Sequence, residues 1–486
     1  LTVNISDVNE IPTITSSAIT TISQNTAYNY ALSATDVEGD TLSWSVKSGE
    51  SLPSWLTLNS GSEAMVTTFA GNGTAAFADG TGDDVSFYNP RDVTVDSSGN
   101  VYVADTNSNK IRKISPDGVV TTLAGSGTAA FSDNLVASLA SFDYPRGVAV
   151  DSSGNIYVAD YNNQKIRKVF SDEGLVLTLA GSGDYAFADG IGAAASFKYP
   201  TGVAVDSSGN VYVADASNHK IRKISPVGVA LTLAGSGAQG SADGGGLASF
   251  NFPSDVAVDS NGNVYVADYS NHKIRKISPE GVVTTLAGSG DGGSVDGAGA
   301  SASFYYPVGV AVDSSGHVYV VDSGNHKIRK ISPEGIVTTL AGSGDGGSAN
   351  GAGATASFYY PQGIAVDSNG NVYVADVSNH KIRKITQSTG LTLSGTPSNA
   401  YVGDHNIDLV VSDGTTTVAQ SFTITVANIN EAPTDITLSA NTLAENSAIG
   451  TLVGSLSAAD IDANVDVGET ATFSFCGGSD DANFSL

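Results

Sequence analysis

The chain has 486 residues, with 49 Asp or Glu against 22 Lys or Arg, which gives a formal net charge of -27 at pH 7. A charge of this sign opposes binding to DNA, RNA and anionic membrane surfaces, so we expect no nucleic acid partner. Cys476 is the only cysteine, which excludes an intrachain disulfide. No apolar run is long enough to span a bilayer, so we expect no direct membrane insertion in this segment.

The composition favours short strands over long helices, because glycine (56 residues) is abundant and charged residues make up only 15%. The first strand-like segments are "LTVNISDVNE" (1–10) and the run that ends in "LTLNSG" (56–61). No signal peptide precedes them, and we expect the sequence to be a section of a longer protein.

Six copies of one unit follow, and each contains an apolar segment that ends in aspartate, such as "GVAVD". These aspartates recur every 53–55 residues, at Asp96, Asp151, Asp206, Asp259, Asp313 and Asp367. A fixed period of this size indicates stacked or radially arranged units.

Each copy predicts four short antiparallel strands, separated by turns rich in Gly and Asn. In the third copy they are "GVAVD", "VYVAD", "IRKIS" and "VALTLAG". Four such strands form one blade of a β-propeller. The segment "VTTFAG" (66–71) precedes the first copy, and the sixth copy stops after "KIRKIT". We therefore predict that residues 66–71 complete the last blade and close the ring.

The turn before the third strand carries an Asn-His pair in four copies, Asn218-His219, Asn271-His272, Asn325-His326 and Asn379-His380. With the repeat pattern, these pairs resemble the NHL-repeat family, although the first two copies read "NSNK" and "NNQK". The resemblance covers residues 64–388 and implies a six-bladed β-propeller. It implies much less about function, because one fold supports many functions.

The flanks resemble cadherin-like modules. Residues 11–63 and 389–432 are similar to the two halves of one Ig-type β-sandwich, joined when "LTLNSG" is placed next to "TGLTLSGTP". Residues 1–10 resemble the end of a preceding repeat, and residues 433–486 the beginning of a following one. We predict an all-β chain in which the propeller is inserted into a sandwich and followed by a truncated second sandwich. The resemblance implies a tandem array of the kind found in large bacterial surface adhesins, hence an extracellular or cell-surface location.

Cadherin-type arrays hold Ca²⁺ at their junctions, and hard oxygen ligands suit that ion. Carboxylate and amide side chains occur in the expected motif order around both junctions. The candidate ligands are Asp7, Asn9, Glu10, Asp36, Glu38 and Asp40 at the first junction, and Asn430, Glu431, Glu445, Asp460 and Asp462 at the second. Gln24 stands where the first junction would need a Glu, and the alternative for both sets is turn residues in surface loops.

The motif "KIRK" recurs six times and contains 18 of the 22 basic residues. Copies spread around a ring cannot form one basic patch, so we interpret them as scaffold, with the arginines paired to the "VAD" aspartates. The "NHK" histidines are also interpreted as structural. The loop residues Asp79, Asp133, Asp189, Asp243 and Asp296, with Asn350 in the sixth copy, are interpreted as turn residues rather than as an acidic rim. We expect His317 and His405 to be isolated and exposed.

Binding is expected where the copies differ, on the end of the ring that carries the longest loops. Arg91 and Arg146 follow the loop proline in neighbouring copies, and Tyr161 and Tyr269 follow the "VAD" aspartate. Together they suit a carboxylate or an acidic sugar. The alternative is that they are ordinary surface residues.

The sequence therefore predicts a non-enzymatic, Ca²⁺-dependent adhesion or ligand-binding segment whose partner is a surface protein or a carbohydrate. One alternative is a metal-dependent lactonase- or lyase-like enzyme with its site in the propeller channel. That alternative needs Asp, Glu, Asn or His side chains that point into the channel from the innermost strands, and these strands read as mostly apolar. Another alternative is a purely structural spacer.

Overall fold

The computed structural model describes residues 10–35, 42–59, 64–171, 173–387, 391–429, 435–438 and 456–459. By its internal contacts the chain forms two units, residues 62–389 and residues 1–61 with 390–486. The described ranges contain strands and short 3-10 turns and no α-helix, and none of their helical segments has the length and apolar character needed to cross a membrane.

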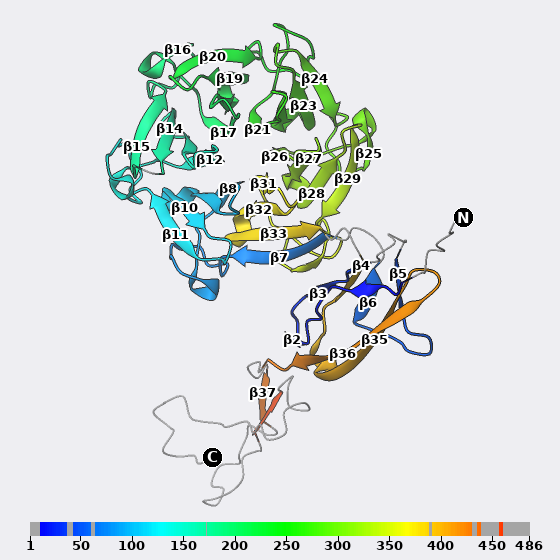
Figure 1. Ribbon diagram of the computed structural model, residues 1–486. Coiled ribbons are helices and arrows are strands. Elements are labelled where there is room, and N and C mark those ends of the chain that lie inside the picture. The colour runs from blue at the N-terminus through cyan, green and yellow to red at the C-terminus, as the bar shows by residue number, and fades with distance from the viewer. Residues whose placement is uncertain are drawn as a thin grey trace, which may run out of the picture. The chain divides into compact units, whose positions relative to one another are not determined.

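Within residues 62–389 the described strands form six antiparallel sheets that are arranged radially around a central axis (Figure 1), and the innermost strands of all six line a central channel. The first strand of each sheet lies innermost and the last lies outermost. The blades are, in order, β8 (Pro90–Val95), β9 (Val101–Asp105), β10 (Lys110–Ile114) and β11 (Val120–Ala124); β12 (Pro145–Val150), β13 (Ile156–Asp160), β14 (Lys165–Phe170) and β15 (Leu175–Ala180); β17 (Pro200–Val205), β18 (Val211–Asp215), β19 (Lys220–Ile224) and β20 (Val229–Ala234); β21 (Pro253–Val258), β22 (Val264–Asp268), β23 (Lys273–Ile277) and β24 (Val283–Ala287); β26 (Pro307–Val312), β27 (Val318–Asp322), β28 (Lys327–Ile331) and β29 (Ile336–Ala341); β31 (Ile364–Val366), β32 (Val372–Asp376), β33 (Lys381–Gln387) and β7 (Ala64–Ala70).

Short elements complete the loops of the propeller. Two-residue strands extend the outer edge of three blades, namely β16 (Gly190–Ile191), β25 (Gly297–Ala298) and β30 (Gly351–Ala352). The 3-10 turns are η1 (Gly82–Asp84), η2 (Thr106–Ser108), η3 (Ala137–Leu139), η4 (Gly192–Ala194), η5 (Ala216–Asn218), η6 (Tyr269–Asn271), η7 (Gly299–Ser301), η8 (Ser323–Asn325) and η9 (Val377–Asn379).

The ring is closed by its own N-terminal strand, as predicted. Strand β7 pairs with β33 as the fourth strand of the sixth blade, with Val66 opposite Ile385, and Figure 1 shows the blue strand beside the yellow one. The strand begins at Ala64, two residues before the predicted start. The core lies between neighbouring blades: Tyr212 of the third blade packs with Phe250 and Val264 of the fourth. Because "VYVAD" packs against a neighbour on both faces, it is buried along its whole length.

The arginines of the "KIRK" copies are scaffold, as interpreted from the sequence. Arg222 has no exposed surface, and its Nη1 donates to Asp215 Oδ2 at 2.7 Å. Its Nη2 donates to Asp189 Oδ1 at 2.7 Å. The equivalent arginine of every blade pairs with its "VAD" aspartate at 2.6–2.8 Å. The loop aspartates are therefore ion-pair partners of the scaffold in five blades, and the interpretation as turn residues was wrong.

The NHL-type histidines join each blade to the next. His219 caps η5 in the left-handed conformation with φ 54°, and its Nδ1 accepts a hydrogen bond from the Phe252 backbone N–H at 3.1 Å. In the first two blades the side-chain oxygens of Asn109 and Gln164 accept the same bond, from the N–H groups of Tyr144 and Tyr199. The "NSNK" and "NNQK" departures therefore preserve the bond with a different acceptor.

This equivalence predicts how His219 tolerates replacement. His219→Gln should change the free energy of unfolding by less than about 1 kcal/mol, whereas His219→Leu leaves the Phe252 N–H without an acceptor and should cost roughly 1–3 kcal/mol. Burial lowers the pKa of His219, with a contribution from Lys198. The unfolded chain therefore takes up a proton first as the pH falls through about 6.5, and the wild type loses stability there. Urea unfolding at pH 5 and pH 7.5 tests both points, and equal stability of the two variants would contradict the assigned bond.

In the second unit, segments that precede and follow the propeller in the sequence contribute strands to the same sheets. Strand β34 (Thr392–Gly395) lies between β3 (Tyr28–Ala31) and β6 (Leu56–Asn59). A second sheet orders β2 (Thr21–Ser23), β36 (Thr417–Ala427), β35 (Gly403–Ser412) and β5 (Ser43–Val46). One core contains Tyr28 and Leu393 together with Leu409 and Val426. The remaining elements are β1 (Thr13–Ile14), β4 (Ala34–Thr35), η10 (Asn399–Tyr401), β37 (Asp435–Leu438) and β38 (Leu456–Ala459). The cadherin-like identity of this unit stays a prediction.

Candidate binding pocket of the propeller

One end of the channel opens into a pocket of about 1140 Å³, to which all six blades contribute. Each blade supplies the residue that follows its loop proline, and five supply the residue that follows the "VAD" aspartate. The two sets are Arg91, Arg146, Thr201, Ser254, Val308 and Gln362, and Tyr161, Ala216, Tyr269, Ser323 and Val377. The strand directions bring these two kinds of connection to the same end of the ring, as the sequence predicted.

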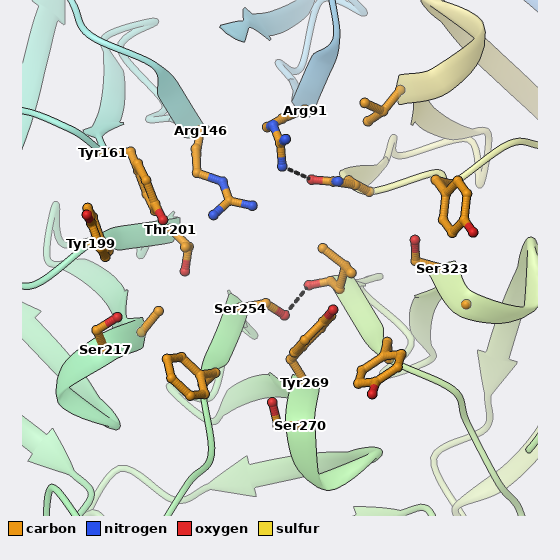
Figure 2. A pocket seen from close by; sticks show the side chains of 18 of the residues that line it. Arg91, Arg146, Tyr161, Tyr199, Thr201, Ser217, Ser254, Tyr269, Ser270 and Ser323 are labelled. Atoms are coloured by element: carbon orange, nitrogen blue, oxygen red, sulfur yellow. Dashed lines mark hydrogen bonds between the residues drawn. The ribbon is translucent and has the colours of Figure 1, made fainter. Parts of the chain in front are cut away.

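Arg91 and Arg146 reach from neighbouring blades toward the middle of the pocket (Figure 2). Arg91 is held by neutral groups, since its Nη1 donates to Gln362 Oε1 at 3.0 Å and its Nη2 to the Tyr144 hydroxyl at 2.8 Å. The guanidinium carbon of Arg146 lies 4.7 Å from the centre of the Tyr161 ring. Burial and the nearby charge of Arg91 lower the pKa of Arg146 to about 10. The two cations therefore repel each other in a partly desolvated site.

The pocket is basic within an acidic protein. Four cations lie outside the "KIRK" copies, namely Lys47, Arg91, Arg146 and Lys198, and the last three line the pocket. Among its described lining residues none is Asp or Glu. Within the described ranges, no carboxylate lies within 4.0 Å of the side-chain nitrogens of Arg91 or Arg146. Arg91 and Arg146 are partly buried, and a cation that loses hydration without gaining an anionic partner is destabilised, so the arrangement favours an anion in the pocket.

Aromatic rings form much of the wall. Tyr161 and Tyr199 are stacked, with ring centres 4.5 Å apart and planes at 10°. Tyr269 stacks on Tyr306 at 4.8 Å. Tyr199 and Tyr306 have positive φ of 53° and 52°, a conformation that is uncommon for bulky residues. The Tyr199 N–H donates to Gln164 Oε1 and the Tyr306 N–H donates to His272 Nδ1, both from the preceding blade. These bonds hold the backbone conformation, and so the scaffold fixes the rings in place.

Two carboxylates lie in the channel directly below the arginines. Asp92 and Asp255 come from opposite blades and line one small cavity of about 30 Å³ with Arg91 and Arg146. Asp92 Oδ2 accepts from the Val148 N–H at 2.8 Å, and Asp255 Oδ2 accepts from the Val310 N–H at 2.9 Å. The other four blades have glycine at this position, Gly147, Gly202, Gly309 and Gly363. A Cβ atom at Gly202 or Gly363 would collide with Asp255 or Asp92.

The innermost strands are mostly apolar, as read from the sequence, but Asp92 and Asp255 are exceptions that the sequence reading missed. Burial and the charge of Asp255 raise the pKa of Asp92 well above its usual value. Burial raises the pKa of Asp255 to about 7, against the hydrogen bonds from the Val310 and Val256 N–H groups. Near neutral pH this pair readily holds a proton.

The structure brings Arg91, Arg146, Tyr161 and Tyr269 together in one pocket, which the sequence predicted from their repeat positions. Of the proposed calcium ligands, Glu10 is exposed. The others lie outside the described residues, namely Asp7, Asn9, Asp36, Glu38, Asp40, Asn430, Glu431, Glu445, Asp460 and Asp462. Among the described residues no cluster of three or more His, Cys, Asp or Glu is placed to hold a metal.

Two histidines were wrongly expected to be isolated and exposed. His317 occupies the turn position of Asn in other copies, and its ring Nδ1 lies 3.2 Å from Asp313 Oδ2. His405 Nε2 lies 2.6 Å from the Tyr401 carbonyl oxygen. Sequence reasoning also missed Lys198 and Tyr199, which immediately precede a loop proline. The position of Tyr199 is aromatic in five of the six copies and therefore reads as scaffold, whereas the position of Lys198 differs between copies without a pattern that marks the pocket.

Six segments of the propeller match the NHL repeat family, at residues 87–114, 142–169, 197–224, 250–277, 304–331 and 358–385. The propeller consists of six NHL repeats. The match confirms the resemblance to NHL repeats that the sequence predicted for the propeller. The family match does not extend to the flanking unit, whose adhesin context stays a prediction.

Similar proteins agree with this assignment of the NHL propeller. The chain is 33% identical over 341 residues to NHL repeat-containing protein 2 of Gallus gallus, covering 62% of this chain and 46% of that protein. It is 31% identical over 288 residues to Protein SUPPRESSOR OF QUENCHING 1, chloroplastic, of Arabidopsis thaliana, covering 55% and 27%. The chain thus spans less than half of either relative. A solved structure of a structural genomics protein of unknown function from Bacteroides thetaiotaomicron is 17% identical, with a TM-score of 0.54. The match covers 78% of this chain and 99% of that one, and it shows the fold alone.

Proposed function

We propose that this chain is a non-enzymatic ligand-binding segment, and that the NHL propeller presents its binding site at the pocket end of the ring. The observation that carries the proposal is the pair Arg91 and Arg146, which face the same pocket without a carboxylate partner in the described chain. The scaffold arginines of this propeller have such partners. A surface protein or a carbohydrate is the proposed partner.

The wider role that we propose is Ca²⁺-dependent adhesion at a cell surface. The order of the acidic motifs in the flanks supports this role, because it matches the junctions of cadherin-type arrays. In this account Ca²⁺ bound at the junctions stiffens the flanking modules, and the propeller contacts the partner. The carboxylates at Asp92 and Asp255 are the groups that the alternative, a metal-dependent lactonase- or lyase-like enzyme, would use in the channel.

Bead adhesion tests the proposed function. Beads coated with the whole chain are applied to surfaces carrying a panel of glycans and surface proteins, in Ca²⁺ and in EDTA. We expect Arg91→Gln with Arg146→Gln to lower retention at least about tenfold, since roughly 1.4 kcal/mol of lost binding already has that effect. Lys47→Gln, which removes the one cation outside both "KIRK" and the pocket, should leave retention unchanged. Equal adhesion by the wild type, the double arginine variant and Lys47→Gln would favour the structural spacer.

A further inference from the structure

The charges around the pocket restrict the kind of anion that it can take. Arg91, Arg146 and Lys198 supply three positive charges inside the pocket, while the chain as a whole carries -27. A long polyanion would have to approach the rest of this acidic surface, which repels it. A ligand with one anionic group, placed where Arg91 and Arg146 meet, gains the attraction without that repulsion. The guanidinium fork suits a carboxylate or a sulfate ester.

The walls restrict the remainder of the ligand. The stacked pair Tyr161 and Tyr199 and the pair Tyr269 and Tyr306 present flat aromatic surfaces. Hydroxyl groups of Ser217, Ser270 and Ser323 surround the same space (Figure 2). A sugar ring matches both features, because it has apolar C–H faces and a rim of hydroxyl groups. The volume of about 1140 Å³ exceeds that of a single sugar ring.

We infer that this pocket binds an acidic sugar, with the anionic group of the sugar held between Arg91 and Arg146 and its ring against the tyrosines. The inference rests on the proposed function and names the ligand class of the same site. Arg91 is already oriented by Gln362 and Tyr144, so the anion meets a positioned guanidinium. Its two Nη atoms are the groups that face the pocket partners, while its Nε atom is buried without a hydrogen-bond partner in the described structure.

Calorimetric titration of the whole chain tests the inference. The probes are methyl β-D-glucuronide and N-acetylneuraminate as carboxylate sugars, and glucose 6-sulfate as a sulfate ester. Methyl β-D-glucoside has the glucuronide ring without the charge, and N-acetyl-L-glutamate has carboxylates without a ring. We expect at least one acidic sugar to bind at least tenfold more tightly than the glucoside and the acyclic acid. The carboxylate and sulfate probes then show which anion the pocket prefers.

The variants separate binding from folding. Arg91→Gln with Arg146→Gln should weaken the best acidic sugar at least tenfold, and Tyr269→Ala should weaken the sugars more than N-acetyl-L-glutamate. Without ligand, Arg146→Gln should unfold at a temperature no lower than that of the wild type, because it removes a cation that lacks an anionic partner. A purely structural arginine would instead lower the unfolding temperature when replaced. Lys47→Gln is the matched control.

Four results would overturn the inference. If the glucoside binds as tightly as the glucuronide, the anion is not recognised. If N-acetyl-L-glutamate binds as tightly as the best sugar, the ligand is an acidic peptide. If no probe binds while the coated beads still adhere through Arg91 and Arg146, the inference fails and the proposed function stands. Loss of both the probe binding and the arginine-dependent adhesion would remove the proposed function as well.

Discussion

Arg222→Met should lower the free energy of unfolding of the propeller by about 3–5 kcal/mol, because it leaves a buried carboxylate without its counterion. Asp215 has no exposed surface. It also accepts hydrogen bonds from the Asn218 side chain at 2.9 Å and from the Lys198 N–H at 2.7 Å, and these bonds hold it in place after the arginine is gone. The same substitution removes the hydrogen bonds that Arg222 donates to Asp189 and to the carbonyl oxygens of Ser196 and Ala188.

Chemical unfolding at pH 7.5 measures this effect. Lys223→Met is the matched control, because the Lys223 ammonium of the same "KIRK" copy lies 5.1 Å from the Tyr212 ring centre in a half-exposed position, and it should cost less than about 1 kcal/mol. Adding Asp215→Asn to Arg222→Met should recover part of the loss, since the uncompensated charge is then removed. A loss for Arg222→Met no larger than that of the control would show that the ion pair contributes nothing to the scaffold.

Asp255→Asn should stabilise the propeller at pH 8, by roughly 1–4 kcal/mol, since one pKa unit corresponds to about 1.4 kcal/mol. The pKa of Asp255 rises from 3.8 in the unfolded chain to about 7 in the folded channel, chiefly through burial. The folded chain therefore binds more protons than the unfolded chain between about pH 4 and pH 7. Stability consequently falls as the pH rises through this window, and the full loss is present above pH 7.

Thermal unfolding of the wild type and Asp255→Asn from pH 4 to pH 8 checks this sign. The two proteins should be nearly equal at pH 4 and diverge toward pH 8. Asp206→Asn is a control of opposite sign: burial raises its pKa, but hydrogen bonds from Asn210 and the Tyr212 hydroxyl give a net lowering. That variant should therefore lose stability relative to the wild type as the pH rises above about 4. If the wild type were instead more stable than Asp255→Asn at pH 8, the raised pKa assigned to the buried Asp92 and Asp255 pair would be wrong.

The blades and their closure could be predicted from the sequence because the repeat is local. Each strand of a blade is a few residues from the next, and the missing fourth strand of the sixth copy identified residues 66–71. The Arg222–Asp215 pair is separated by only seven residues and was also predicted. The Arg222–Asp189 pair spans 33 residues, from one copy into the loop before it, and the repeat pattern alone did not reveal it.

The candidate site shows why a consensus can hide functional residues. Arg91 and Arg146 can be predicted because the residue after the loop proline differs from copy to copy. Asp92 and Asp255 stand at the next position, where the other four copies have glycine, and the shared pattern "GVAVD" hides them. The sequence signal for these channel carboxylates is that aspartate replaces glycine at this position in two opposite blades. The pocket charge could not be predicted either, because the position of Lys198 depends on how the loops fold over the ring.

A crystal structure of the whole chain with methyl β-D-glucuronide would locate the anionic ligand and so decide whether Arg91 and Arg146 bind it. We expect electron density for the sugar at the pocket end of the propeller, with its carboxylate between the guanidinium groups of Arg91 and Arg146 and its ring against Tyr161 or Tyr269. Density elsewhere on the propeller, or a pocket without ligand when the sugar is bound at another site, would contradict it.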